Sequence, residues 1–62
     1  MKKTYKLQKG RRVVVFSPEE MTISWYEYTK EGWTCVDKQT KGELFMLRNN
    51  YKHYVKKGYK SI

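Results

Sequence analysis

The stretch Ser17–Asp37, SPEEMTISWYEYTKEGWTCVD, decides the fold, because it is compatible either with two strands or with a helix followed by a strand. Met21, Ile23 and Trp25 recur at every second position, which is the side-chain period of a strand. Most residues around them are Thr or aromatic, types that favour strands. We therefore expect a strand over about residues 21–29.

The alternative is a helix over residues 18–31, and the sequence leaves it open. Ser17 would cap such a helix, with Pro18 at its first position and Glu20 completing a capping box. Gly32 would end it. The fold would then be β-α-β-α.

Strands are also predicted on both sides of this stretch. Arg12–Phe16, RVVVF, is a run of β-branched residues that closes on an aromatic. Lys30-Glu31-Gly32 predicts a hairpin loop whose glycine supplies a positive φ, followed by a returning strand over about residues 33–38. The basic residues 1–10 are weakly patterned and predict a flexible arm, or a short edge strand over Thr4–Gln8.

The hairpin has consequences for the placement of its aromatic residues. Pairing Tyr28 with Trp33 would pair Trp25 with Val36. Strand alternation would then place Tyr26, Tyr28 and Trp33 together on one face. A change of one residue in the loop would alter these faces, so the register stays open.

A helix is predicted over about residues 41–57. Thr40–Glu43, TKGE, matches a capping box directly before an apolar run, and Gly58 is placed to end the helix. Residues 59–62 are a possible short strand. The predicted fold class is α+β: one domain of residues 1–62, in which this helix packs on a three-stranded antiparallel sheet of about residues 12–16, 21–29 and 33–38.

The size and composition exclude the usual supports of a small domain. The chain has 62 residues with one cysteine, Cys35, and one histidine, His53, so it forms no internal disulfide and no four-ligand zinc site. Ten aromatic residues, or homo-oligomerisation, would have to compensate. A single free cysteine and the lack of an apolar leader or membrane span favour a cytoplasmic location without a membrane partner.

The charge is strongly positive and unevenly distributed. The net charge is +8, and residues 1–12 carry six basic residues and no acid. Residues 13–40 carry a net −3, and residues 41–62 a net +5. Such a field attracts polyanions, so nucleic acid or an acidic protein surface is an expected partner. Excess lysine that serves only solubility is the alternative.

A helical wheel separates the predicted helix into two faces. The expected core face consists of Leu44, Leu47, Tyr51, Tyr54 and Val55. A continuous basic stripe, formed by Arg48, Lys52 and Lys56 with Lys41, lies beside that face and has Phe45 among its cations. We predict that this stripe contacts nucleic-acid phosphates, with help from Arg11 and Arg12.

The aromatic face of the hairpin is a second candidate site. Tyr26, Tyr28 and Trp33 would suit stacking of single-stranded bases, and they would equally suit a protein interface, as would Phe45. Catalysis has little support, because no acid–base pair, phosphate loop or activated nucleophile can be identified. We therefore predict no enzyme, no catalytic residues, no metal and no cofactor.

The stretch Trp25–Ile62 resembles short accessory proteins encoded by tailed phages. The shared pattern is a Trp- and Tyr-rich hairpin, a capped helix and a Gly-aromatic-x-x-aliphatic end, here GYKSI over Gly58–Ile62. This resemblance implies a phage or prophage origin, expression in the cytoplasm of a bacterial host, and binding of a host or phage component. A weaker resemblance to the arm-type DNA-binding domain of phage integrases implies a three-stranded sheet that enters the major groove.

These observations predict a small, basic, non-enzymatic binding protein that contacts nucleic-acid phosphates through the helix. One alternative is a protein-binding effector, for example an inhibitor of a host enzyme, that uses the aromatic face or the basic stripe. Another alternative is a homo-oligomeric structural protein.

Overall fold

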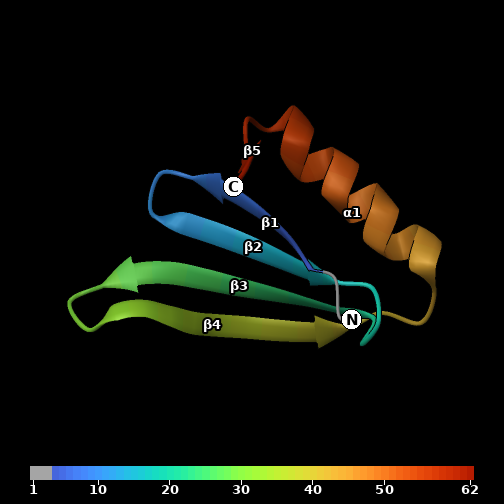
Figure 1. The fold of residues 1–62 in the computed structure, drawn as a ribbon, viewed down its shortest axis with the longest axis horizontal. Coiled ribbons are helices and arrows are strands. Elements are labelled where there is room, and N and C mark those ends of the chain that lie inside the picture. The colour runs from blue at the N-terminus through green and yellow to red at the C-terminus, as the bar shows by residue number, and fades with distance from the viewer. Residues whose placement is uncertain (1–3) are drawn as a thin grey trace.

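The computed structural model describes residues 4–62, which form one antiparallel sheet with a single helix on one face (Figure 1). The five strands lie in the order β4-β3-β2-β1-β5. The elements are β1 (Tyr5–Lys9), β2 (Arg12–Ser17), β3 (Thr22–Thr29), β4 (Gly32–Thr40), α1 (Leu44–Lys56) and β5 (Lys60–Ser61). The predicted α+β class is confirmed, but the sheet has five strands and not three.

The N-terminal segment supplies the first additional strand. The predicted short strand over Thr4–Gln8 is confirmed as β1, and the flexible arm is wrong for the described part of this segment. β1 pairs with β2 on one side and with β5 on the other, so it is an inner strand and not an edge strand. The part of the predicted arm over residues 1–3 lies outside the described residues. Gly10 adopts a φ of 61° in a two-residue turn, which brings β1 back along β2 and buries Leu7.

The decisive stretch forms strands, and the helical alternative is wrong. β3 pairs with β2 along its length from Ser17–Thr22 to Arg12–Glu27, and this pairing satisfies backbone groups that a helix would bond internally. Gly32 has a φ of 96° and closes the β3–β4 hairpin as predicted. The possible short strand predicted over residues 59–62 is realised as β5, which extends over two residues.

A bulge changes the register of the β3–β4 hairpin. Tyr28 pairs with Trp33 as expected, but Trp25 lies opposite Asp37 and not opposite Val36. The irregularity falls between Trp25 and Tyr26, where β4 carries one extra residue. Because of the extra residue, Cys35 before the bulge and Lys38 after it point to the same face of the sheet as Tyr26.

The predicted capping box at the start of α1 is wrong. Thr40 belongs to β4 and pairs with Thr22, and the next residue, Lys41, donates its backbone N–H to the carbonyl of Met21 at 2.7 Å. Sheet pairing therefore continues through the segment that local sequence assigned to the helix. The helix begins at Leu44 after an extended Glu43, which forms no side-chain cap.

The end of α1 agrees with the prediction. Gly58 has a φ of 101° and donates to the carbonyl of Val55, while Tyr59 donates to the carbonyl of Tyr54, both at 3.1 Å. These two bonds form a Schellman motif, and the rings of Tyr54 and Tyr59 pack edge to face beside it.

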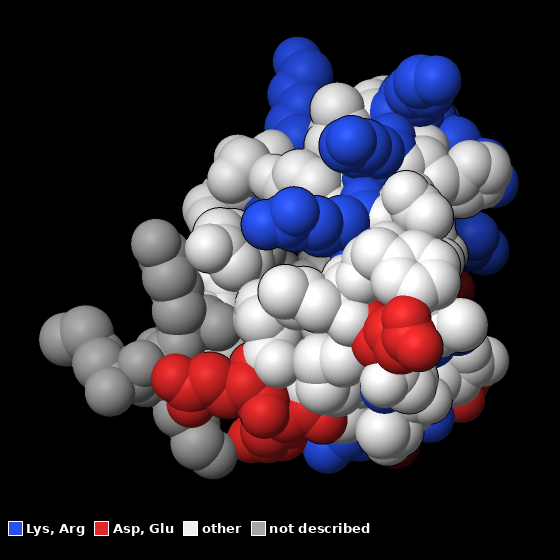
Figure 2. Space-filling view, turned by 90° about the vertical axis from the view of Figure 1, so that its right-hand side faces the viewer, with Lys and Arg blue, Asp and Glu red and all other residues white. Residues whose placement is uncertain are grey.

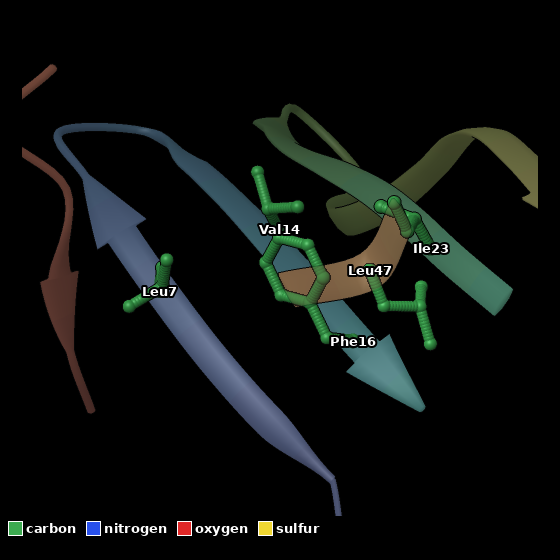
Figure 3. Packing of buried hydrophobic residues seen from close by; sticks show 5 residues of the cluster. All are labelled: Leu7, Val14, Phe16, Ile23 and Leu47. Atoms are coloured by element: carbon green, nitrogen blue, oxygen red, sulfur yellow. The ribbon is translucent and has the colours of Figure 1, made fainter. Parts of the chain in front are cut away.

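Five buried side chains form the core between sheet and helix (Figure 3). They are Leu7, Val14, Phe16, Ile23 and Leu47. Leu47 is the one buried residue of α1, and Tyr51 and Tyr54 pack partly buried against the same cluster. Leu44 and Val55 were expected in the core but are 45% and 47% exposed, because only the middle of the predicted core face of the helix lies against the sheet. The opposite face of the sheet carries no helix within residues 4–62.

Candidate nucleic-acid interface

The basic stripe of α1 is present on the folded surface. Arg48, Lys52 and Lys56 are all exposed, and none of their side chains has a hydrogen bond or an ion pair with another residue of 4–62. The helix Leu44–Lys56 contains no Asp or Glu. Successive members are one helical turn, about 6 Å, apart along the axis. The three cations therefore form a continuous positive line that no carboxylate neutralises.

The stripe lies on the flank of α1 that faces β1. Arg48 and Lys52 line an open groove of about 510 Å³ together with Tyr5, Phe16 and Leu44. Figure 2, which views the molecule from the right-hand side of Figure 1, shows most Lys and Arg side chains of that face gathered over its upper part, with Asp and Glu side chains mainly lower down. On this face the positive charges are therefore gathered and not spread evenly.

Three of the predicted contributors are not part of the stripe on α1. Lys41 precedes α1, is half-buried, and donates from Nζ to Oε1 of Gln39 at 3.0 Å. Arg12 lies in β2, where its Nε is 3.4 Å from Oε1 of Glu27. Arg11 is exposed in the turn before Arg12. The structure thus places Arg11 and Arg12 in the sheet and its turn and not on α1, and Glu27 neutralises part of the charge of Arg12.

A second groove of about 680 Å³ opens on the other flank of α1. Its walls include Trp25 and Tyr54, whose side chains are joined by a hydrogen bond from Nε1 to Oη at 2.9 Å. Lys9 also lines it and donates from Nζ to the backbone carbonyl of Lys57 at 2.7 Å. Because Glu27 and Asp37 lie among its cations, this groove has mixed charge and is less suited to a polyanion than the stripe.

The predicted aromatic face is assembled on the side of the sheet away from α1. Tyr28 and Trp33 are cross-strand partners whose ring centroids are 5.3 Å apart at an interplanar angle of 76°. They are 51% and 47% exposed, and Tyr26 lies half-buried on the same face. Phe45, at 54% exposure, lies on α1 and is not part of this group.

Sequence reasoning missed the lysines that share this face. The pairing of β1 with β5 and of β3 with β4 brings Lys6, Lys38 and Lys60 onto the same side as the aromatic rings. β1 was predicted only as an alternative to a flexible arm and β5 only as a possible short strand, so neither belonged to the predicted three-stranded sheet. The two-residue alternation within a strand predicts which of its side chains share a face. Only the pairing between strands shows that the lysines of one strand lie on the same face as the aromatic rings of another.

Within residues 4–62, neither His53 nor Cys35 forms a hydrogen bond or an ion pair with another titratable side chain. His53 is exposed on α1 with its ring 5.8 Å from that of Tyr54, and the exposed Cys35 contacts the carbonyl of Asp37 at 3.4 Å. Residues 4–62 contain no cluster of three His, Cys, Asp or Glu side chains that could hold a metal. None of their helices is long and apolar enough to cross a membrane.

Comparison of the chain with protein-family models, with characterised proteins and with solved structures finds no match. The resemblances to phage accessory proteins and to integrase arm domains therefore stay predictions.

Proposed function

We propose that this protein is a small, non-enzymatic nucleic-acid-binding module that contacts phosphates through the α1 stripe of Arg48, Lys52 and Lys56. One observation carries the proposal: three exposed cations on one helix flank lack any carboxylate partner within residues 4–62. An unpaired cation is free to displace counterions from a phosphate backbone. Such contacts position the protein without reading bases.

Part of the stripe has a simpler role as well. Lys56 lies in the last turn of α1, where a positive charge complements the helix dipole. Arg48 and Lys52 lie one and two turns earlier, where that effect is weak. The dipole thus accounts for one of the three cations, and phosphate binding accounts for all of them.

The test compares two variants with equal loss of charge. The stripe variant is Arg48→Gln/Lys52→Gln/Lys56→Gln, and the matched control is Lys9→Gln/Lys30→Gln/Lys57→Gln. We expect the stripe variant to bind duplex DNA and RNA about tenfold more weakly, with a salt slope smaller by about 2 to 3, whereas the control changes less. Equal loss in both variants would show a response to net charge alone and would overturn the site.

A second candidate function is an effector that binds an acidic segment of a host protein. The observation in its favour is the groove beside Arg48 and Lys52, whose floor is apolar and includes Phe16 and Leu44. An apolar side chain flanked by carboxylates would fit between these cations. Recovery of one partner after nuclease treatment, lost in Leu44→Glu, would support it. Recovery of nucleic acid only would exclude it, and sedimentation would reveal self-association.

The origin and location belong to the same proposal. A phage-encoded protein that acts in the cytoplasm of a bacterial host would meet abundant nucleic acid there. The exposed thiol of Cys35 fits a reducing compartment.

A further inference from the structure

We infer that the sheet face away from α1 binds single-stranded nucleic acid, with bases on its aromatic rings and phosphates on its lysines. This inference rests on the proposed nucleic-acid binding, but it uses a different surface from the α1 stripe. It would add selectivity for unpaired bases to a contact that by itself reads only phosphates.

The composition of this face follows from the strand registers. Leu7 and Ile23 point into the core, so their neighbours in β1 and β3 point the other way. Cross-strand pairing then defines four rows across the open face, the fourth of which holds Ser17, Thr22 and Thr40. The first holds Tyr28 and Trp33, the second holds Lys60, Gln8, Val13, Tyr26 and Cys35, and the third holds Lys6, Val15, Ser24 and Lys38.

The first row holds only aromatic residues, the second holds both Tyr26 and Lys60, and the third holds two lysines and no aromatic residue. Consecutive rows are about 7 Å apart along the strands, and the outer strands β4 and β5 are about 19 Å apart across the sheet. The aromatic rings lie at the β3–β4 end, whereas Lys60, Lys6 and Lys38 lie at the two sides of the next rows. Between Lys6 and Lys38 the third row holds the small side chains of Val15 and Ser24, so a bound strand would meet a shallow floor there.

The rings are available to a ligand. Because the rings of Tyr28 and Trp33 stand at 76° to one another, they do not stack together, and each is about half exposed. A nucleobase can therefore stack on a ring face that the partner ring leaves open. Tyr26 lies two residues from Tyr28 on the same strand face and continues the surface toward Lys60.

The charge of this face favours a nucleic-acid strand over an apolar protein surface as its ligand. Within residues 4–62, the side chains that point to this face include the three lysines Lys6, Lys38 and Lys60 and no carboxylate. Glu27 and Asp37 lie on the α1 side, opposite Arg12 and Trp25 respectively, because the bulge in β4 keeps Asp37 there. Glu31 lies in the β3–β4 turn. A purely apolar protein interface would leave the lysines unpaired, whereas a nucleic-acid strand uses both the rings and the cations.

The test uses the intact protein, a single-stranded oligonucleotide of about ten nucleotides and a duplex of the same sequence. Tyr28→Ala/Trp33→Ala should weaken single-strand binding about 5- to 100-fold and leave duplex binding within about twofold. Trp33→Phe should retain most of the affinity, because it keeps a ring. The matched control Met46→Ala/Val55→Ala removes two exposed apolar side chains of α1 that line neither groove, and it should leave both affinities unchanged.

The lysines are tested separately. Lys6→Gln/Lys38→Gln/Lys60→Gln should reduce the single-strand salt slope by about 2. Single-strand binding that is the same in Tyr28→Ala/Trp33→Ala as in the control would overturn this inference, while a defect in the stripe variant would keep the proposed function. A host protein captured through Trp33, with unchanged single-strand affinity, would assign the face to a protein. If the wild type binds no nucleic acid at all, both proposals are wrong.

Discussion

The indole nitrogen of Trp25 donates a 2.9 Å hydrogen bond to the hydroxyl oxygen of Tyr54, and this bond joins β3 to the C-terminal half of α1. The ring of Tyr54 also lies against Phe16 of the core and Tyr59 beyond the helix. One tyrosine thus connects the sheet, the helix and the segment that leads into β5. The orientation of α1, and with it the direction of the basic stripe, depends on this contact.

Tyr54→Phe keeps the ring and removes the acceptor of the Trp25 indole. We expect the free energy of unfolding to fall by about 1 kcal/mol, because water replaces only part of the bond at a half-buried site. Urea denaturation followed by tryptophan fluorescence measures it. The control is Tyr51→Phe, whose hydroxyl has no hydrogen-bond partner within residues 4–62. Equal losses in the two variants would contradict the role of the bond.

Leu47→Ala should be the most damaging substitution in α1. Leu47 is 3% exposed and is the one buried residue of the helix, so its truncation leaves a cavity in a core of five residues. We expect a loss of about 2 to 5 kcal/mol, which approaches the whole stability of so small a domain. Leu44→Ala removes the same atoms from a site that is 45% exposed and should cost little. Thermal unfolding of both variants distinguishes the two sites.

Lys9→Met should loosen the end of α1 without affecting its start. The ammonium of Lys9 donates at 2.7 Å to the carbonyl of Lys57, the residue that caps the helix. Its loss should cost about 0.5 to 1.5 kcal/mol and should be smaller at high salt. The amide of Gly58 should exchange faster with solvent. Lys6→Met, on the same strand but the opposite face, should leave that exchange rate unchanged.

Gly58→Ala should destabilise the protein by about 1 to 2 kcal/mol. Gly58 has a φ of 101°, a conformation in which a Cβ is strained, and it ends the helix through the Schellman bonds. Gly42→Ala is the matched control, since Gly42 has no positive φ and a Cβ there meets no heavy atom within 4 Å. A similar stability of the two variants would show that the left-handed turn is not under strain.

Removing residues 1–9 should unfold the protein, not merely weaken its binding. Leu7 is 1% exposed in the core, and β1 separates β2 from β5, so the deletion removes core packing and the only partner strand of β5 in residues 4–62. Removing residues 60–62 deletes no buried residue and should be tolerated better. Circular dichroism of the two truncations tests this. A folded protein without residues 1–9 would restore the interpretation of this segment as an arm.

Much of the local structure could be predicted from the sequence. The two-residue period over Met21–Trp25 indicated β3, and the glycines at positions 32 and 58 marked the hairpin turn and the end of α1. These features depend on a few neighbouring residues, because side-chain alternation and a positive φ are local properties of the backbone. The stripe of α1 was predictable for the same reason, since the helical repeat alone places Arg48, Lys52 and Lys56 on one flank.

Other features depended on contacts between distant segments. Thr40 matches a helix cap in sequence, but pairing with Thr22 draws it into β4, because tertiary hydrogen bonds override a local capping preference. The weak pattern around Leu7 becomes an inner strand only because β2 and β5 flank it.

The sequence by itself determined where most strands, turns and the helix end occur, and it determined which cations α1 presents. Only the tertiary structure decided the order of the five strands, the bulge opposite Trp25 and the open face that combines Lys60 with Tyr26 and Trp33. The physical reason is that local conformation follows from neighbouring side chains, whereas register and shared faces follow from pairing between segments far apart in the chain.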